Sequence, residues 1–212
     1  MYVPICEFYH FEKLATNGAK MVIISNYSRR ASTTMNKVKS LGLDPSVFEG
    51  VITSGELMHQ YFQRRDDPWF AALGIGRSCI HITWSDRGPI SLEKLSLFWS
   101  MEPKPWGFPL VTSPVSLEDL EKMLEQCASK RIPMIVANLD FVTVEARALL
   151  IMPGTLAAKY EKLGGEVKWM GKPDQIIYKS AMVMVGVDAS DSIAVGDSLH
   201  YDIKGANEAR IA

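Results

Sequence analysis

The sequence predicts an α/β fold with a parallel sheet. Three short apolar runs rich in Val, Ile or Met end in small or polar residues: MVIISN (21–26), IPMIVAN (132–138) and SIAVGD (192–197). None of these runs alternates between apolar and polar residues, which is typical of parallel strands covered on both faces. Helical patterns lie between the runs, and this alternation of strand and helix indicates an α/β architecture.

The helix patterns can be followed in chain order. FEKLATNG (11–18) and ASTTMNKVKSLG (31–42) each place apolar residues on one face and end on a glycine. Thr53 and Glu56 have the spacing of a capping box, which predicts a helix that begins there. SLEDLEKMLEQCASKR (116–131) is amphipathic and carries acidic residues in its first turn, where the helix dipole favours them.

The middle of the chain has a different character. One strand, SCIHITWS (78–85), stands in a stretch rich in arginine and aromatic residues. The proline-dense segment MEPKPWGFPLVTSPVS (101–116) fits no regular element. We therefore expect a second module over 66–165, inserted into a core made of 1–65 and 166–212.

The composition is that of a soluble globular protein. Hydrophobic residues make up 47% of the 212 residues and the net charge is -1, so there is no basic footprint for nucleic acid or an anionic membrane. No apolar run reaches the length of a membrane span, and the N-terminus does not resemble a signal peptide. The default expectation is a cytoplasmic protein, with an organelle as the alternative. Buried, reduced thiols are expected for the cysteines, Cys6, Cys79 and Cys127.

VGDSLHYDIKGAN (195–207) contains the first candidate site. Asp197 ends an apolar run, and Asp202 lies in the first turn of the next predicted helix, so both carboxylates can face one spot. Gly196 permits a close backbone approach. Carboxylate oxygens at a partly hydrated site suit magnesium. The alternative is a turn-forming aspartate followed by an acid that interacts with the helix dipole.

Two further positions could bind phosphate. Ser25 and Asn26 follow a strand and precede a helix, where a hydroxyl group and unpaired N–H groups can hold a phosphate, although ordinary helix capping is the alternative. Lys172, in GKPDQIIY, can supply a point charge to a phosphate or to crowded carboxylates, or it can simply be solvated. No metal-ligand spacing is seen among the histidines, His10, His59, His81 and His200.

Together these signals resemble a known family. Ser25, Lys172 and the two aspartates occur in the order and strand context of motifs two, three and four of the haloacid dehalogenase (HAD) superfamily. The residues of these motifs are similar to those of its class IIA, the NagD-like or p-nitrophenylphosphatase-like phosphatases. ISNYSRRAS resembles the phosphate loop of that class, VITSGE its exit towards a cap, and ANLDFVTVEA the substrate loop of the cap, with Leu139 in place of the usual proline.

The resemblance implies a Rossmann-like core with an inserted α/β cap and the hydrolysis of small phosphomonoesters. In the family, an aspartate on the first strand attacks phosphorus, while Mg²⁺ offsets charge in the transition state. Lys172 would also steady the nucleophile, and Asp202 would support the metal through water. The implied residues are, for phosphate, Ser25, Asn26 and Lys172; for Mg²⁺, Asp197 and Asp202; for the substrate loop, Asn138 and Asp140.

Three features depart from the family pattern. Motif one should be a strand ending in an aspartate before FEKLATNGAK, but MYVPICEFYH contains none, and Glu7 and Cys6 are unsuited to in-line attack. The prolines of SLFWSMEPKPWGFPLVTSPVS cannot make a central strand of the cap, and the chain stops at ANEARIA, before the family's closing strand and helix. We therefore expect a core that lacks its N-terminal strand and C-terminal end, little or no phosphatase activity, and VPICEF (3–8) as a makeshift strand.

Two other interpretations stay open. One is a non-catalytic module that binds phosphate or a small phosphorylated metabolite, as a homo-oligomer or paired with an intact paralogue. The other is an alternatively started or mis-spliced product with no settled function. Neither nucleic acid nor membrane is an expected partner under any of these interpretations.

Overall fold

The computed structural model divides the chain into two compact units. The first contains Met1–Leu57, Ala137–Leu139 and Met170–Ala212, and the second contains Met58–Val136 and Asp140–Trp169. The residues that the structure describes are 5–64, 68–69, 78–79, 82, 98–99, 117–145 and 148–212.

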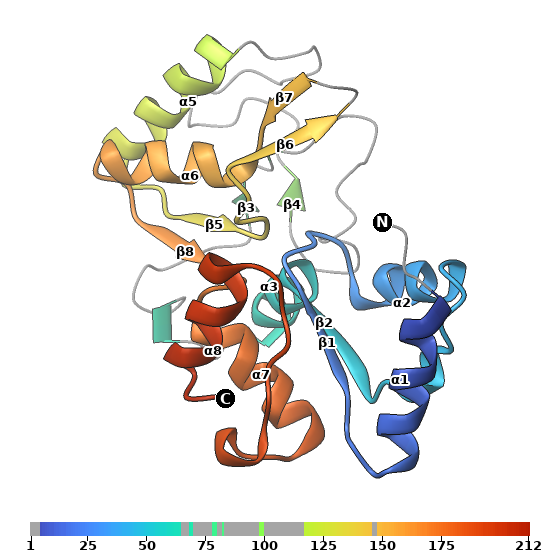
Figure 1. Cartoon of the computed structure of the whole chain (residues 1–212). Coiled ribbons are helices and arrows are strands. Elements are labelled where there is room, and N and C mark those ends of the chain that lie inside the picture. The colour runs from blue at the N-terminus through green and yellow to red at the C-terminus, as the bar shows by residue number, and fades with distance from the viewer. Residues whose placement is uncertain are drawn as a thin grey trace. The chain divides into compact units, whose positions relative to one another are not determined.

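The first unit is built on two parallel strands, β1 (Val22–Ser25) and β2 (Gly50–Thr53). The helix α7 (Gln175–Val185) packs against both strands, and α2 (Ala31–Ser40) packs against β2 (Figure 1). Burial of the apolar strand side chains between these helices removes them from water, which is the main force that holds the unit together.

Shorter elements complete the first unit. The 3-10 turn η1 packs against α1 and α2, and α8 packs against α7 and η4. Their bounds are α1 (Ile5–Thr16), η1 (Pro45–Val47), η3 (Ala189–Asp191), the π-type turn η4 (Leu199–Ile203) and α8 (Lys204–Glu208). The helix α3 (Ser54–Arg64) follows β2 directly, and the boundary between the two units falls within it.

The described strands of the second unit form three pairs. Two pairs are parallel, β5 with β8 and β3 with β4, and β6 pairs antiparallel with β7. Their bounds are β3 (Ser78–Cys79), β4 (Phe98–Trp99), β5 (Met134–Val136), β6 (Val142–Glu145), β7 (Ala148–Ile151) and β8 (Val167–Trp169).

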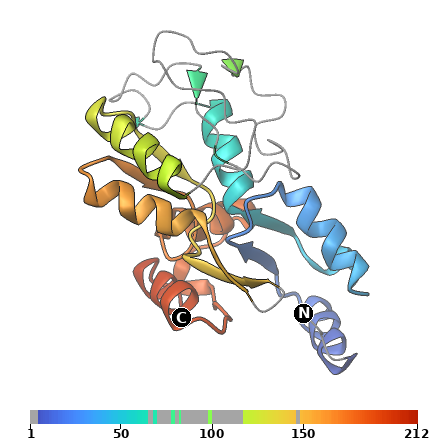
Figure 2. The same cartoon turned by 90° about the horizontal axis from the view of Figure 1, so that it is seen from above.

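Two helices supply the core of the second unit. α5 (Leu117–Ser129) and α6 (Pro153–Lys162) lie side by side in both views (Figure 1, Figure 2). Leu124 and Cys127 of α5 and Tyr160 of α6 form a buried cluster. Cys127 is a free thiol, as expected, and burial raises its pKa, so it stays protonated at neutral pH.

The predicted α/β architecture with parallel strands is confirmed. β1 lies within the run MVIISN and β5 within IPMIVAN, and both belong to parallel pairs. α5 covers nearly all of the helix predicted over 116–131. These elements form as expected because their local apolar pattern agrees with the burial that the fold provides.

The strand predicted over 192–197 does not form, so that prediction is wrong. The segment has no regular secondary structure, and no strand in the described part of the chain pairs with it. Ile193 and Val195 are 82% and 97% exposed. An isolated extended segment has no ladder of hydrogen bonds to hold it, so apolar composition alone does not make it a strand.

The makeshift strand predicted over 3–8 is also wrong. Residues from Ile5 onwards belong to the helix α1, which extends to Thr16 and therefore starts well before the predicted helix over 11–18. Because these residues are helical, their carbonyl groups bond within the helix and the segment offers no edge to a sheet.

Some predictions fall on residues that the structure does not describe. The strand predicted over 78–85 is described only at Ser78–Cys79, where β3 forms, and at residue 82. The proline-dense segment 101–116 and His81 lie outside the described residues. In the described part of the chain, no helix is both long and apolar enough to cross a bilayer.

Candidate functional site

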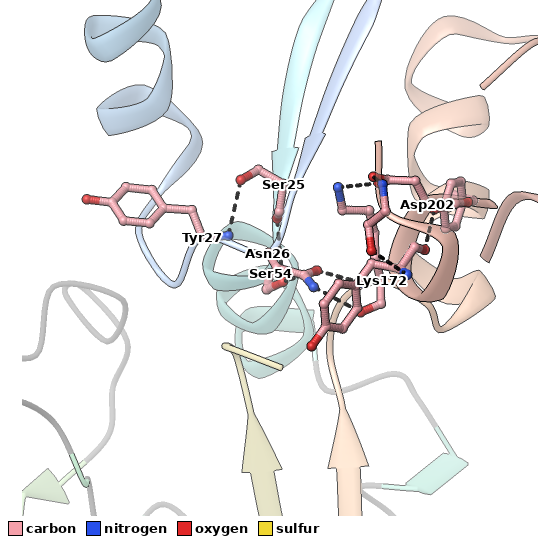
Figure 3. Close-up of polar contacts among 9 residues, drawn as sticks. Ser25, Asn26, Tyr27, Ser54, Lys172 and Asp202 are labelled. Carbon is pink, nitrogen blue, oxygen red and sulfur yellow. Dashed lines mark hydrogen bonds and ion pairs between the residues drawn. The ribbon is translucent and has the colours of Figure 1, made fainter. Parts of the chain in front are cut away.

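The candidate site lies in the first unit, at the carboxyl ends of β1 and β2. Ser25 is the last residue of β1 and pairs in register with Thr53, the last residue of β2. Since the two strands are parallel, the residues that follow them, Asn26 and Ser54, emerge at the same edge (Figure 3). The Ser54 hydroxyl lies 3.4 Å from the Asn26 side-chain oxygen and 3.5 Å from the Ser25 carbonyl oxygen.

Asn26 joins the end of β1 to a segment far away in sequence. Its side-chain nitrogen donates to the carbonyl oxygen of Lys172 at 2.9 Å, and its side-chain oxygen accepts from the Lys172 N–H at 2.7 Å (Figure 3). A single amide group thus satisfies both backbone groups of Lys172. Two bonds in a fixed geometry orient the residue more firmly than one bond would.

Gly171 makes this close approach possible. A β-carbon at residue 171 would lie 2.2 Å from the Ser54 hydroxyl oxygen and 2.6 Å from the Asn26 side-chain oxygen. Both distances are far below van der Waals contact. Packing at the strand ends therefore requires a glycine at residue 171, because only a residue without a side chain allows this approach.

The side chain of Lys172 forms an ion pair with Asp202. Its ammonium nitrogen lies 2.7 Å from Oδ1 of Asp202, and the two side chains are 17% and 14% exposed. The other oxygen, Oδ2, accepts from the Ser198 N–H at 3.1 Å. Burial raises the pKa of Asp202, but the hydrogen bonds and charge of Lys172 and the nearby N–H groups outweigh it and hold that pKa below its ordinary value.

Tyr178 supports the turn that carries Asp202. Its hydroxyl lies 3.0 Å from the carbonyl oxygens of Tyr201 and Asp202, to which it donates. Burial raises the pKa of Tyr178 to about 12, and the negative charge of Asp202 adds to the effect. The phenol therefore stays protonated and remains a donor at neutral pH.

Ser25 and Asp197, the two remaining residues of the predicted motifs, lie beside this arrangement. The Ser25 hydroxyl accepts from the Tyr27 N–H at 3.2 Å, and the Tyr27 ring points away from the other labelled residues (Figure 3). Asp197 is exposed, and its backbone N–H bonds to Asp202. A β-carbon at Gly196 would lie 2.4 Å from the Asp202 β-carbon, so the glycine again permits close packing.

The carboxylates suit a hydrated cation better than a fully coordinated one. Among the described residues, no group of three or more His, Cys, Asp or Glu side chains is placed to hold a metal ion. Asp202 already accepts from Lys172 and Ser198, whereas Asp197 is open to solvent. Mg²⁺ retains several waters and commonly uses one or two protein carboxylates, so these residues fit it in that mode.

The predicted substrate loop spans both units. Asn138 belongs to the first unit and Asp140 to the second. Leu139, between them, is 3% exposed, and its carbonyl oxygen lies 3.4 Å from the Tyr201 hydroxyl. The assignment of Asn138 and Asp140 to substrate stays a prediction.

Sequence reasoning missed two residues that shape the site. Ser54 stands in the TSGE pattern, so its place after a strand was a signal that could have been used. Tyr178 lies in the apolar run of α7 and gave no local signal, because its hydroxyl partners are 23 and 24 residues away.

Comparison with known proteins gives a match to a family model. A family model described as HAD-hydrolase-like matches residues 169–212, the segment that carries Lys172, Asp197 and Asp202. No curated protein sequence matches the chain. The C-terminal segment therefore has the sequence pattern of the HAD-like hydrolases.

Solved structures extend the likeness to the whole chain. A hydrolase of the haloacid dehalogenase-like family from Brucella suis 1330 is 23% identical, with a TM-score of 0.76 over 96% of this chain and 75% of that one. A double mutant of a thermostable NPPase from Geobacillus stearothermophilus is 19% identical, with a TM-score of 0.71 over 100% and 82% of the two chains. A p-nitrophenyl phosphatase from Archaeoglobus fulgidus is 20% identical, with a TM-score of 0.68 over 99% and 78%. The chain has the HAD-like hydrolase fold, and the resemblance stated from its motifs is confirmed at that level.

Proposed function

We propose that the first unit is a phosphate-binding scaffold of the HAD phosphatase type, suited to small phosphomonoesters. The observation that carries this proposal is the setting of Lys172. Its side chain is paired with Asp202, while its backbone is held by Asn26 at the end of β1. An ammonium group oriented in this way can neutralise a phosphate that lies against the strand end.

The neighbouring residues have complementary roles. The Ser25 hydroxyl and the N–H groups of the loop after β1 would bind phosphoryl oxygens. Asn26 orients Lys172 and thereby sets where its charge is presented. Tyr178 holds the backbone of Asp202, which in turn keeps the Lys172 ammonium group in place.

Magnesium is the cofactor that we propose for this site. Asp197 would be the direct carboxylate ligand, since its exposed position leaves space for the waters that Mg²⁺ retains. Asp202 would act through water, because both of its oxygens already accept hydrogen bonds. When bound, the ion would offset the negative charge of the phosphoryl group.

We propose that these 212 residues bind phosphate with little or no turnover. The first aspartate in the sequence is Asp44, which lies after β1, and its side chain caps η1 by accepting from the Ser46 N–H. No aspartate upstream of β1 is therefore present to form an aspartyl-phosphate.

The second unit is proposed as the cap, with Asn138 and Asp140 on its substrate loop. A second function, binding of a protein partner, is favoured by a separate observation. Ile193 and Val195 are almost fully exposed, and exposed apolar side chains in one segment are typical of an interaction surface. A homo-oligomer or a pairing with an intact paralogue would cover them.

Calorimetric titration with inorganic phosphate, in buffer containing magnesium, tests the proposal. We expect the unaltered chain to bind phosphate and Lys172→Met to weaken binding by about tenfold or more, because a charged donor is lost. Lys179→Met is the matched control: Lys179 is an exposed lysine on α7, and its removal should leave the affinity unchanged.

Two results would contradict the proposal. One is the absence of phosphate binding, or an equal loss in the Lys172 and Lys179 variants. The other concerns turnover, which is measured with p-nitrophenyl phosphate and magnesium and is expected at background. Turnover that disappears in Asp197→Ala would show that the chain is an active enzyme.

A further inference from the structure

The loop between β1 and α2 is attached along its length to one corner of the first unit. We call residues 26–30 the phosphate loop and residues 53–56, where β2 passes into α3, the TSGE corner. Every residue of the TSGE corner bonds to the phosphate loop or to a residue directly beside it. The corner is therefore a candidate for the part of the molecule that sets the shape of the phosphate loop.

Besides the contact of Ser54 with Asn26, two of these attachments use a backbone group or a small side chain. The Thr53 hydroxyl donates to the carbonyl oxygen of Arg29, and the Gly55 N–H donates to that of Tyr27 at 3.2 Å. A β-carbon at Gly55 would lie 2.0 Å from the Ser28 carbonyl oxygen. The phosphate loop and the TSGE corner are thus in direct backbone contact, and a side chain at residue 55 would push them apart.

The fourth attachment is made by Glu56 and has the most bonds. Its Oε2 accepts from Arg30 Nε at 2.7 Å and from the Ala31 N–H at 3.1 Å, and its Oε1 accepts from Arg30 Nη2 at 3.2 Å. The Glu56 side chain is 13% exposed and the Arg30 side chain 29%. A forked guanidinium–carboxylate pair of this kind fixes the orientation of both groups.

Glu56 has a role that its sequence pattern does not suggest. In a capping box the glutamate returns to the first N–H of its own helix. Here Thr53 accepts from the Glu56 N–H at 2.9 Å, as a capping residue should, but the Glu56 side chain binds the start of a different helix, α2. The carboxylate therefore ties α3 to the point where the phosphate loop becomes α2.

We infer that Glu56 is a positioning residue for phosphate binding: it holds Arg30 and the first N–H of α2, and so fixes the phosphate loop that begins beside Ser25. This inference rests on the proposed function of the site. Glu56 occupies the Ala31 N–H and the Arg30 guanidinium, so these groups serve the loop's conformation and the phosphate is left to Ser25 and Lys172. An ordered loop loses less conformational freedom on binding, which strengthens affinity.

Glu56→Ala and Glu56→Gln test the inference when combined with two measurements. Phosphate affinity is measured by calorimetry, and hydrogen exchange is measured at the amides of residues 27–31. We expect Glu56→Ala to weaken phosphate binding by about tenfold and to speed exchange in the loop. Glu56→Gln keeps one acceptor for the Ala31 N–H, so its phosphate affinity and loop exchange should lie between those of Glu56→Ala and of the unaltered chain. Glu49→Ala, which removes an exposed glutamate just before β2, is the matched control.

The Arg30 side of the pair gives an independent check. If Glu56 acts through Arg30, then Arg30→Met and Glu56→Gln will weaken phosphate binding by similar factors, and the double variant will weaken it by less than their product. If the loss of affinity in the double variant equals the product of the two single losses, Arg30 binds phosphate itself, and the inference is overturned.

The outcomes separate this inference from the proposed function. If Glu56→Ala unfolds at a lower temperature but binds phosphate with unchanged affinity, Glu56 has only a structural role and the inference fails. Loop exchange that matches the unaltered chain also overturns it. If the unaltered chain binds no phosphate, the proposed function has failed, and loop exchange alone then decides whether Glu56 positions residues 27–31.

Discussion

Asp202 shows how closely charge and burial are balanced in this site. Its carboxylate is mostly buried, which by itself is unfavourable, and it is compensated by one ammonium group and by backbone N–H groups. Lys172 depends on Asp202 in the same way, because an unpaired ammonium group would be costly at this depth. The two residues therefore act as a unit, and removal of one leaves the other uncompensated.

Asp202→Asn should destabilise the first unit in a pH-dependent manner. Since folding lowers the pKa of Asp202 from 3.8, the unfolded chain binds more protons than the folded one just below that pH. Its contribution to stability is full above that value and is lost as pH falls through the folded-state pKa. We expect the variant to lower the free energy of unfolding by about 1–2 kcal/mol at neutral pH and by less in acid.

Urea unfolding at about pH 7 and about pH 3 checks this expectation. Asp188→Asn, at an exposed aspartate whose side chain makes no capping bond to the turn it precedes, is the control and should change stability little at either pH. Equal destabilisation by Asp202→Asn at both pH values would contradict the ionic origin of the effect.

At the scale of the element, a strand forms where a neighbouring strand is available to pair with it. β1 and β2 form because each has the other, and α7 covers both. The equally apolar segment 192–197 has no strand partner in the described part of the chain and forms no strand, although the Ala194 N–H donates to the carbonyl oxygen of Ala212. Apolar composition therefore selects the residues that can form a strand, and pairing decides which of them do.

Replacing the exposed apolar side chains of this segment tests that view. The double variant Ile193→Thr and Val195→Thr should change the free energy of unfolding by no more than about 0.5 kcal/mol and should reduce aggregation, because neither side chain is buried. Ile52→Thr in β2, which is 2% exposed, is the contrast and should cost about 2 kcal/mol or more. A large loss of stability in the double variant would mean that the segment is packed.

At the scale of the whole molecule, the candidate site and the second core belong to different units. Ser25, Asn26, Lys172, Asp197 and Asp202 all lie in the first unit. The buried cluster of Leu124, Cys127 and Tyr160 lies in the second. The chain passes from one to the other within α3, just after the TSGE corner.

Leu124→Ala tests whether the two units depend on each other for phosphate binding. Leu124 is 1% exposed, so its truncation should destabilise the second unit by about 2–5 kcal/mol and speed hydrogen exchange in α5 and α6. Phosphate affinity should remain that of the unaltered chain. A loss of affinity as large as that of Lys172→Met would show that the site requires an intact second unit.

The local pattern accounted for much of the fold. The runs MVIISN and IPMIVAN are continuously apolar and the stretch over 116–131 has a helical period, and each formed the predicted element. The prediction over 192–197 failed because strand formation depends on a neighbour, and no local pattern reports whether that neighbour exists. Helix α1 began earlier than expected because helix starts are weakly marked when no capping residue is present.

The sequence by itself determined which residues carry charge and hydroxyl groups near strand ends, and their order from Ser25 to Lys172 to Asp202. Those properties are chemical and local, so they can be read from residue types and spacing. Only the tertiary structure decided that Asn26 holds the backbone of Lys172, that Asp202 is paired with Lys172, and that Glu56 binds the start of α2. The physical reason is that these contacts join residues 25 to 146 positions apart, and such long-range geometry arises only when the strands and helices pack together.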